Sequence, residues 1–355
     1  METDNIPEIL IPFLQKPSKF KQKAAAFKWE FREWKYNAKL AVIKPYMRAQ
    51  LRHRLTHHVY RENADPRVLL CCIGKGENRY VREFVEWYRG IGFSGVVIYD
   101  NNDLDGERFE DVLDDHIRSG FVKIVDFRGR SVVQLAAYED CYGRFGAQYD
   151  WIAFFDMDEF LAIGSGESIG EYLSSGRFRR SEMVHVNWIN HTDNGRLHYE
   201  DRPVQERFPE HLPPDARVHR HVKSIVRGGI PYLKWRSSPH TPAPNMLRCA
   251  NASGKRCRSS SPFCKIDNST VALHHYNLKS TGEYLQKVVR GYPDQIMHTG
   301  SIFSMLSNYF RYNKPTEEKI GMLVDGLTQE NGKNAVTQDY ATAFRAYFLS
   351  LCKKS

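Results

Sequence analysis

Short apolar runs alternate with amphipathic stretches over residues 66–160. The apolar runs are rich in Val, Ile and aromatic residues and predict buried strands, whereas the amphipathic stretches predict helices packed on them. This alternation indicates right-handed crossovers, a largely parallel sheet and therefore an α/β fold. The predicted order is strand 67–74, helix 75–92, strand 95–103, helix 108–120, strand 121–127, helix 131–148 and strand 149–160.

The pattern becomes looser beyond residue 160. It predicts strands within 182–195 and 222–229, a short helix at 204–208, and a strand followed by a helix over 269–294. The last 50 residues have a mostly helical pattern. We therefore expect three parts: an N-terminal arm over residues 1–65, a main α/β domain over 66–300 and a helical segment over 301–355.

Carboxylates collect where the predicted strands end. Asp100 closes the second strand, and the sequence DWIAFFDMDEFL, residues 150–161, runs from apolar residues directly into Asp156, Asp158 and Glu159. Three carboxylates at the end of a buried strand need a positive partner. Ligands of open parallel sheets bind beyond the carboxyl ends of the strands. Because neither G-x-G-x-x-G nor G-x-x-x-x-G-K-[ST] occurs, a dinucleotide fold and a P-loop are not supported.

The positive charge of the chain is concentrated near its N-terminus. The net charge is +9, and residues 16–61 hold 13 Lys or Arg but only 2 Glu, so the rest of the chain is close to neutral. Apolar positions from Phe20 to Ala41 recur at steps of four and three, which predicts a helix with an aromatic stripe that stops near Pro45. Such a helix fits an anionic membrane surface. Packing of the stripe on the main domain, with solvated cations, is the alternative, and no nucleic-acid motif accompanies the arm.

Composition places the chain among globular proteins. Hydrophobic residues make up 41% and charged residues 26% of its 355 positions. We find no apolar run near the ~20 residues of a membrane span and no signal-peptide core. The expected location is cytoplasmic, with the arm on the inner face of the membrane as a further hypothesis.

The cysteine pattern favours reduced thiols. Seven cysteines occur, and two of them are adjacent within the first predicted strand, which does not suit a disulfide framework. Cys249, Cys257 and Cys264 lie close together in a Ser/Arg-rich loop. Their spacing lacks the C-x₂₋₄-C pair of structural zinc sites, so the sequence by itself does not favour zinc there.

Two segments together resemble a known family. GENRYVREFVEWYRGIGFSGVVIYDNNDLDG, residues 76–106, and QLAAYEDCYGRFGAQYDWIAFFDMDEFL, residues 134–161, resemble nucleotide-sugar glycosyltransferases of the GT-A fold. The resemblance is to glycosyltransferase family 92 and related bacterial members of family 2, and it extends over about residues 68–290. It implies a metal-dependent transferase with a Rossmann-like central sheet.

The resemblance implies that a divalent ion works with the DxD motif. By this likeness Asp156 contacts the ribose or the ion, Asp158 is a direct ligand, and Glu159 supports them. Mg²⁺ or Mn²⁺ between the carboxylates and a nucleoside diphosphate would neutralise the leaving group. The resemblance also implies a downstream histidine ligand, either His240 or His275. The alternative is that the carboxylates only cap a helix or pair with arginine.

Further residues would bind the donor by the same resemblance. Asp100 would accept the N–H of a pyrimidine base, although an Asx turn is an alternative role for it. The end of the first strand, Cys72, Ile73, Gly74 and Glu77, would also bind the donor. Gln134 would contact the nucleotide or the sugar, and Lys279 would contact the diphosphate. The alternative for Gln134 and Lys279 is a solvated side chain.

The base that an inverting transferase needs is less clearly marked. Asp193 follows a Trp-containing strand where related enzymes carry an acid, but Thr192 replaces the first member of their Glu-Asp pair. Glu206 is the second candidate, and a retaining mechanism stays open.

The function implied by the resemblance is a hexosyltransferase that moves a sugar from a nucleotide sugar, expected to be UDP-linked, to a hydroxyl of a glycan or glycolipid. An arm on the membrane would suit cell-envelope polysaccharide synthesis. A nucleotidyltransferase and a non-catalytic carbohydrate-binding or membrane-tethering protein of the same fold are the alternatives. Nucleic acid is not an expected partner.

Overall fold

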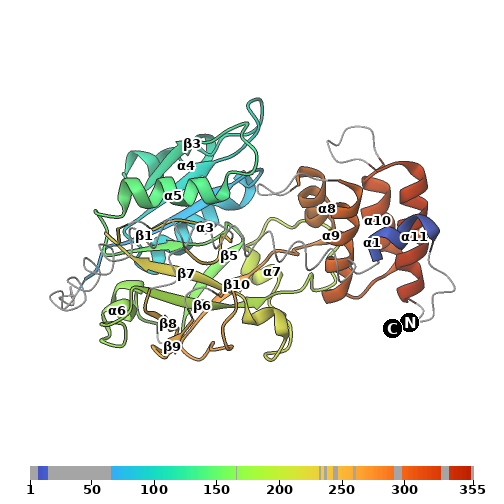
Figure 1. Ribbon diagram of the computed structural model, residues 1–355. Helices are drawn as coiled ribbons and strands as arrows, with labels where there is room; N and C mark the ends of the chain where they lie inside the picture. The colour runs from blue at the N-terminus through green and yellow to red at the C-terminus, as the bar shows by residue number, and fades with distance from the viewer. Residues whose placement is uncertain are drawn as a thin grey trace, which may run out of the picture.

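The computed structural model describes residues 7–14 and 65–352, apart from residue 165, residue 232 and the segments 236–237, 243–246, 259–260, 292–297 and 329–335. The basic arm over residues 16–61 lies outside the described residues. The α/β fold that the sequence predicts is confirmed in the residues that the structure describes (Figure 1). No helix in the described ranges combines the length and apolar character that a membrane span requires.

The described strands form one sheet of ten strands. Its main path runs β3-β2-β1-β4-β7-β6-β10-β5, and β8 and β9 extend it from β6. The neighbours along β3-β2-β1-β4 are all parallel, whereas β7 is antiparallel to β4 and β6. The strands are β1 (Val68–Gly74), β2 (Gly95–Asp100), β3 (Val122–Asp126), β4 (Trp151–Phe154), β5 (Glu159–Ile163), β6 (Met183–Asn190), β7 (Val222–Arg227), β8 (Cys249–Asn251), β9 (Arg256–Cys257) and β10 (Val271–His275).

Helices cover both faces of the parallel half, as its side-chain alternation requires. Along β1, Leu70 packs with α3 (Asn78–Gly90) and α4 (Glu110–Arg118), while Leu69 packs with α5 (Gln134–Phe145) on the other face. Every residue of β1 and β2 is buried, which explains why these strands read as continuous apolar runs. Short helices α6 (Ile169–Ser174), α7 (Val204–Arg207) and η2 (Arg217–Arg220) lie in the later connections.

A separate hydrophobic core holds the C-terminal helices together. It joins α8 (Thr281–Arg290), α9 (Thr299–Tyr312), α10 (Glu317–Gly326) and α11 (Gln338–Cys352) with the N-terminal pieces η1 (Glu8–Leu10) and α1 (Ile11–Leu14). Figure 1 shows this helical part beside the sheet, with both chain ends near it. Tyr284 and Val288 of α8 belong to the helical core, so the helical part begins before the boundary predicted at residue 300.

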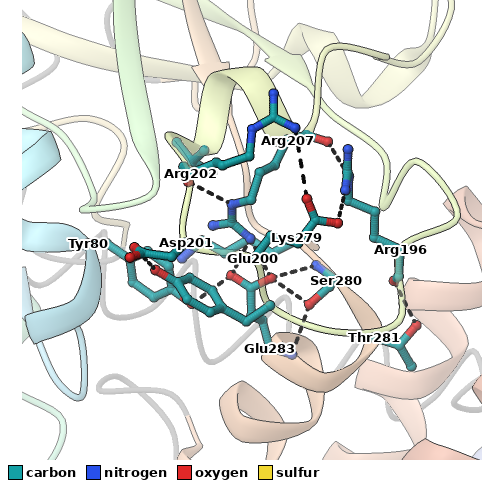
Figure 2. A network of polar contacts seen from close by, with 12 residues as sticks. Tyr80, Arg196, Glu200, Asp201, Arg202, Arg207, Lys279, Ser280, Thr281 and Glu283 are labelled. Carbon is teal, nitrogen blue, oxygen red and sulfur yellow. Dashed lines mark hydrogen bonds and ion pairs between the residues drawn. The ribbon is translucent and has the colours of Figure 1, made fainter.

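A buried ion pair joins the helical part to the α/β part (Figure 2). Nη1 of Arg207 on α7 lies 2.8 Å from Oε2 of Glu283 on α8, and the two side chains are only 1% and 2% exposed. Tyr80 of α3 donates its hydroxyl to Oε1 of Glu283 at 2.7 Å. Ser280 caps α8 by accepting the Glu283 amide at its hydroxyl oxygen, and its own amide and hydroxyl donate to the Glu283 carboxylate. A buried carboxylate with this many donors fixes α8 against α3 and α7.

One predicted element is divided in the structure. The apolar run from Trp151 was expected to be a single strand ending in acids, but β4 ends at Phe154 and β5 begins at Glu159. The four residues between them turn back, with the Glu159 amide donating to the Asp156 carbonyl at 3.1 Å. The DxD motif therefore lies in a turn between strands that are not neighbours in the sheet.

Candidate functional site

A cavity of about 530 Å³ lies beyond the carboxyl ends of β1 and β4. Its position is the one expected for ligands of open parallel sheets. The predicted site residues that line it are Ile73, Gly74, Glu77, Gln134, Asp156, Asp158, His240 and His275. A second cavity of about 450 Å³ shares the walls formed by Lys75, Glu77, Asn277, Lys287 and Arg290. The structure thus brings together most of the predicted donor and metal residues.

The DxD turn is held by its own side chains and by β10. Oε2 of Glu159 accepts the Asp156 amide at 2.8 Å, which satisfies a backbone donor that the turn leaves without a strand partner. The Tyr276 amide, just after β10, donates to the Asp158 carbonyl at 2.8 Å. These contacts orient the Asp156 and Asp158 side chains toward the cavity, which both line.

Asp156 is paired with a lysine from another strand. Lys223 of β7 places Nζ 2.7 Å from Oδ2 of Asp156, and the lysine side chain is completely buried. Oδ1 of Asp156 accepts the Gln134 amide at 2.9 Å and the Tyr138 hydroxyl at 3.1 Å. Burial works against the charged carboxylate, but the Lys223 ammonium outweighs it and lowers the pKa of Asp156.

Glu159 is fully buried beside the same lysine. Its Oε1 accepts the indole N–H of Trp188 at 2.7 Å, and its Oε2 lies 3.6 Å from Nζ of Lys223. Burial raises the pKa of Glu159 well above its usual value, because Lys223 offsets only part of the desolvation. Glu159 therefore organises the turn and the Trp188 side chain and does not line the cavity.

Asp158 contacts a lysine and a histidine. Nζ of Lys287 on α8 lies 3.0 Å from Oδ2 of Asp158, and Nε2 of His275 lies 3.4 Å from Oδ1. Burial again opposes ionisation, but Lys287 and then His275 lower the pKa of Asp158 well below its usual range. Asp158 is therefore ionised at neutral pH.

The positive partner that the sequence predicts is present, but in this structure it consists of lysines. The prediction assigned that role to a divalent ion and did not identify Lys223 or Lys287. A signal for Lys223 was available, because it is a cation inside the apolar strand VKSIVR, where an unpaired charge would be costly. Lys287 lies on the amphipathic helix α8 and gives no comparable signal.

The donor set also fits a divalent ion. Mg²⁺ and Mn²⁺ need only one or two protein carboxylates besides substrate phosphate and water, and Asp156, Asp158 and His240 share the cavity wall. Nδ1 of His240 lies 2.9 Å from the Val222 carbonyl, so Nδ1 carries the proton and Nε2 keeps a lone pair. This is the usual arrangement of a ligating histidine. Burial lowers the pKa of His240 to about 3, which keeps the ring neutral.

His275 is engaged differently from His240. Its Nε2 faces Asp158, and its Nδ1 lies 3.4 Å from the Asn190 amide nitrogen, which donates to it. Nε2 therefore carries the ring proton and points at a carboxylate. A protonated ring nitrogen has no lone pair for a metal, so this geometry favours His240 as the ligand.

Basic side chains also line the cavity. They are Lys75, Lys287, Arg290 and Arg311. Arg290 binds Glu77 at 2.8 Å, and Lys279 places Nζ 3.5 Å from the other oxygen of that carboxylate and 3.6 Å from the centre of the Tyr80 ring. Lys279 lines the smaller cavity next to the DxD cavity. Acidic and basic side chains therefore line the same space.

Two further donor candidates do not line either cavity. Cys72 is completely buried, its thiol donates weakly to the Val97 carbonyl, and burial raises the pKa of the thiol well above its usual value. Asp100 forms the Asx turn considered above, since its Oδ1 accepts the Asn102 amide at 2.9 Å. Its Oδ2 is buried without a hydrogen-bond partner in the described structure, and burial raises the pKa of the carboxyl.

The two predicted base residues lie outside both cavities. Asp193 is 3% exposed and binds Lys319 at 2.5 Å and the Tyr309 hydroxyl at 2.6 Å, both through Oδ2. Its Oδ1 accepts the Gly195 amide. Glu206 is exposed on α7 and pairs with Arg202 at 3.3 Å. A catalytic role for either residue stays a prediction, and their contacts are those of structural ion pairs.

Comparison with known sequences finds a family match within the α/β part. Residues 68–241 match the family model of glycosyltransferase family 92. A rice protein described as a glycosyltransferase family 92 protein (Oryza sativa subsp. japonica) is 29% identical over 106 residues, which is 29% of this chain and 18% of the relative. The chain thus spans about a fifth of the length of that relative. The resemblance inferred from the sequence is confirmed.

Solved structures of glycosyltransferases show weaker similarity, both in sequence identity and in TM-score. S. aureus TarS 1–349 is 12% identical with a TM-score of 0.34, over 81% of this chain and 90% of that chain. Its complex with UDP gives 10% identity and a TM-score of 0.37 over the same shares. The mannosyltransferase PcManGT from Pyrobaculum calidifontis, in complex with GDP-Man and Mn²⁺, is 10% identical with a TM-score of 0.33, over 89% of this chain and 96% of that chain. Values this low do not transfer a ligand or an activity to this chain.

Proposed function

We propose that this chain, with a glycosyltransferase family 92 match over residues 68–241, transfers a sugar from a nucleotide sugar to a hydroxyl group. The observation that carries the proposal is the DxD cavity, which is lined by Asp156 and Asp158 together with Lys75, Lys287, Arg290 and Arg311. A nucleoside diphosphate needs cations for its oxygens, and a divalent ion that accompanies it needs carboxylates. One cavity offers both.

The donor would lie along the basic side chains of the cavity. Lys287 and Arg290 line both cavities, so a diphosphate bound by these two side chains would lie where the cavities meet. Oδ2 of Asp100, buried and without a partner in the described residues, is the acceptor that the family resemblance assigns to the N–H of a uracil base, although Asp100 itself lines neither cavity. Gly74, which pairs with Asp100 across β1 and β2, lines the cavity and connects this acceptor to the DxD turn. UDP-sugars are therefore the first donors to test.

Asp158, Asp156 and Nε2 of His240 are the groups that would hold Mn²⁺ or Mg²⁺. When bound, such an ion supplies positive charge to the departing diphosphate. The side chains already in place do related work: Lys223 and Lys287 neutralise the carboxylates, and burial keeps His240 neutral.

The acceptor side is formed by the Trp188 region. Trp188 lines the cavity, stacks on the His221 ring at 4.9 Å and is fixed by its bond to Glu159. Nδ1 of His221 lies 2.9 Å from the Val218 carbonyl and carries the proton, so its Nε2 keeps a lone pair. Burial lowers the pKa of His221 and keeps it neutral. A neutral imidazole lining the cavity is a better-placed base for an acceptor hydroxyl than Asp193 or Glu206.

A role at a membrane or in the cell envelope depends on the basic arm. Residues 16–61 hold 13 of the 51 basic residues and lie outside the described structure. Electrostatic binding of this arm to anionic lipid would bring the cavity to a lipid-linked or envelope-glycan acceptor. Salt-sensitive binding to anionic vesicles, lost when residues 1–60 are removed, tests this part separately.

The central experiment is a screen of nucleotide sugars with and without Mn²⁺. A ligand that binds only the folded state raises the melting temperature, and the best donor is then assayed for sugar transfer and for slow donor hydrolysis. Asp158→Asn should abolish turnover, whereas Asp114→Asn, an exposed acid on α4, should retain it. Release of pyrophosphate from a nucleoside triphosphate incubated with a sugar 1-phosphate would favour the nucleotidyltransferase alternative. A folded protein that binds and turns over no nucleotide sugar would favour the non-catalytic one.

A further inference from the structure

A second cluster of metal-binding side chains lies away from the DxD cavity. His185 of β6, Cys249 of β8 and Cys257 of β9 place one ligand atom each within 4.8 Å of the others. In the part of the chain that the structure describes, this is the one group of three or more His, Cys, Asp or Glu side chains with that spacing. None of the three residues lines either cavity described above.

A fourth side chain joins the cluster from the following loop. Cys264 is half-buried and lies near enough to Cys257 and His185 for both to shift the pKa of its thiol, although its sulfur is not in the group of atoms within 4.8 Å of one another. The loop is held in this position by its backbone, since the Cys264 amide donates to the Arg220 carbonyl at 2.8 Å. Three thiols and one imidazole therefore converge from four separate places in the chain.

The distances are close to those of a tetrahedral zinc site. Zinc bonds of ~2.3 Å to sulfur and ~2.0 Å to nitrogen at tetrahedral angles separate sulfur from nitrogen by about 3.6 Å and two sulfurs by about 3.8 Å. Sγ of Cys257 lies 3.7 Å from Nδ1 of His185 and 3.0 Å from Sγ of Cys249. The Cys249–Cys257 sulfur pair must open by less than about 1 Å on this estimate, and the Cys264 sulfur must move closer to the other three ligand atoms.

The surroundings of the imidazole also favour a metal. His185 is completely buried, and Nε2 has no hydrogen-bond partner among the described residues, while Nδ1 faces a thiol. A buried imidazole without a conventional hydrogen bond is costly. Thiols are weak donors and acceptors, so four such groups gain little from one another without an ion. A zinc ion bound to Nδ1 would give the imidazole and the thiols a common partner, with the proton of the ring on Nε2.

We infer that His185, Cys249, Cys257 and Cys264 form a structural Cys₃His zinc site. All four positions would be filled by protein side chains, as in zinc sites that only stabilise a fold. The sequence does not favour the site because Cys249, Cys257 and Cys264 lack a close pair, and because the fourth ligand lies 72 residues before Cys257. Only the pairing of β6 with β8 and of β8 with β9 brings them together.

The zinc would fix one side of the DxD cavity. It would tie β8, β9 and the loop after them to β6, the strand that carries Trp188 and Asn190 into the cavity wall. Phe263, next to Cys264, forms a β-bridge with His221 and packs on its ring at 4.5 Å. Loss of the zinc should therefore loosen His221 without removing any donor-binding group.

The competing arrangement is a disulfide. Cys249 and Cys257 are directly opposite on β8 and β9, and their sulfurs are 3.0 Å apart. A disulfide between them would leave Cys264 and the buried His185 without a common partner. The two arrangements give opposite results in the same measurements.

The test uses the full chain purified without chelators. We expect about one zinc per chain by elemental analysis, released by a mercurial that blocks thiols. Cys257→Ser and Cys264→Ser should each lower zinc to below about 0.1 per chain. Cys352→Ser, a cysteine on α11, and Asp158→Asn, in the DxD cavity, should retain it. Cobalt in place of zinc should show the intense d–d bands and sulfur-to-metal charge transfer of a tetrahedral thiolate site.

If the serine variants do not fold, zinc content and cobalt binding of the wild-type protein still test the inference. A folded wild-type chain without zinc that also fails to bind cobalt under reducing conditions would overturn the inference. So would an intact mass lower by two hydrogens together with a Cys249–Cys257 disulfide peptide. Failure of sugar transfer with zinc present would contradict the proposed function but not this site.

Discussion

Nζ of Lys223 on β7 lies 2.7 Å from Oδ2 of Asp156, the first residue of the DxD motif, and 3.6 Å from the buried Glu159. The antiparallel register that pairs Phe154 with Ser224 brings this lysine to the end of β4. Lys223 itself is completely buried, and it is the strand-borne counterion of the DxD turn.

Removing this lysine should destabilise the fold. Lys223→Met leaves the buried Glu159 and the partly buried Asp156 without their counterion, and breaking a buried pair in this way costs about 3 kcal/mol. Urea denaturation at pH 7 measures the loss. The deficit should shrink toward pH 5, because the unpaired carboxylates then take up protons. Lys123→Met on the exposed side of edge strand β3 is the control, and an equal effect in both variants would contradict the role of Lys223.

Removing the second lysine should help a metal ion to bind. Lys287 lies 3.0 Å from Oδ2 of Asp158, so its ammonium and a divalent ion compete for that oxygen. We predict that Lys287→Met binds Mn²⁺ about tenfold more tightly in the absence of nucleotide, which corresponds to about 1.4 kcal/mol, but binds UDP more weakly because a diphosphate partner is lost. Titration calorimetry measures both. Unchanged or weaker Mn²⁺ binding would argue against an ion at Asp158.

The Asp193 carboxylate should prove structural. Asp193→Asn leaves the ammonium of Lys319, 5% exposed, without its partner at 2.5 Å, so we expect a loss of about 3 kcal/mol in the free energy of unfolding. Adding Lys319→Met should recover part of that loss, because no buried charge then remains. The opposite result, a fall in kcat of more than about 100-fold with unchanged stability, is what a general base would give.

Buried histidines should make stability depend on pH between about 4 and 6.5. Burial lowers the pKa of His274 to about 4, and Nε2 of His191 lies 2.8 Å from Nδ1 of His274. In this window the unfolded chain binds a proton that the folded chain excludes, so stability falls as the pH falls. We predict that His274→Gln reduces the slope of unfolding free energy against pH near pH 5.2 by about 1.2 kcal/mol per pH unit, close to one proton. Denaturation curves at several pH values measure it, and an unchanged slope would contradict the assignment.

Local patterns were sufficient for the elements of the α/β part. The strands at Val68–Gly74 and Gly95–Asp100 and the helices between them follow the predicted order, because a buried parallel strand and an amphipathic helix have distinct periods. The same logic located the DxD acids and their need for positive charge. It did not find the turn that divides the run after Phe154, because four apolar residues followed by acids fit a longer strand equally well.

The sequence by itself thus determined where the acids lie, which family the α/β part resembles and that a counter-charge is required. Only the tertiary structure decided that Lys223 and Lys287 supply that charge here, that His240 presents a lone pair to the cavity wall, and that His185 meets three distant cysteines. The physical reason is that secondary structure follows from neighbours along the chain. Charge pairing and metal ligation depend on the register between strands that are tens of residues apart, and composition and spacing carry no record of that register.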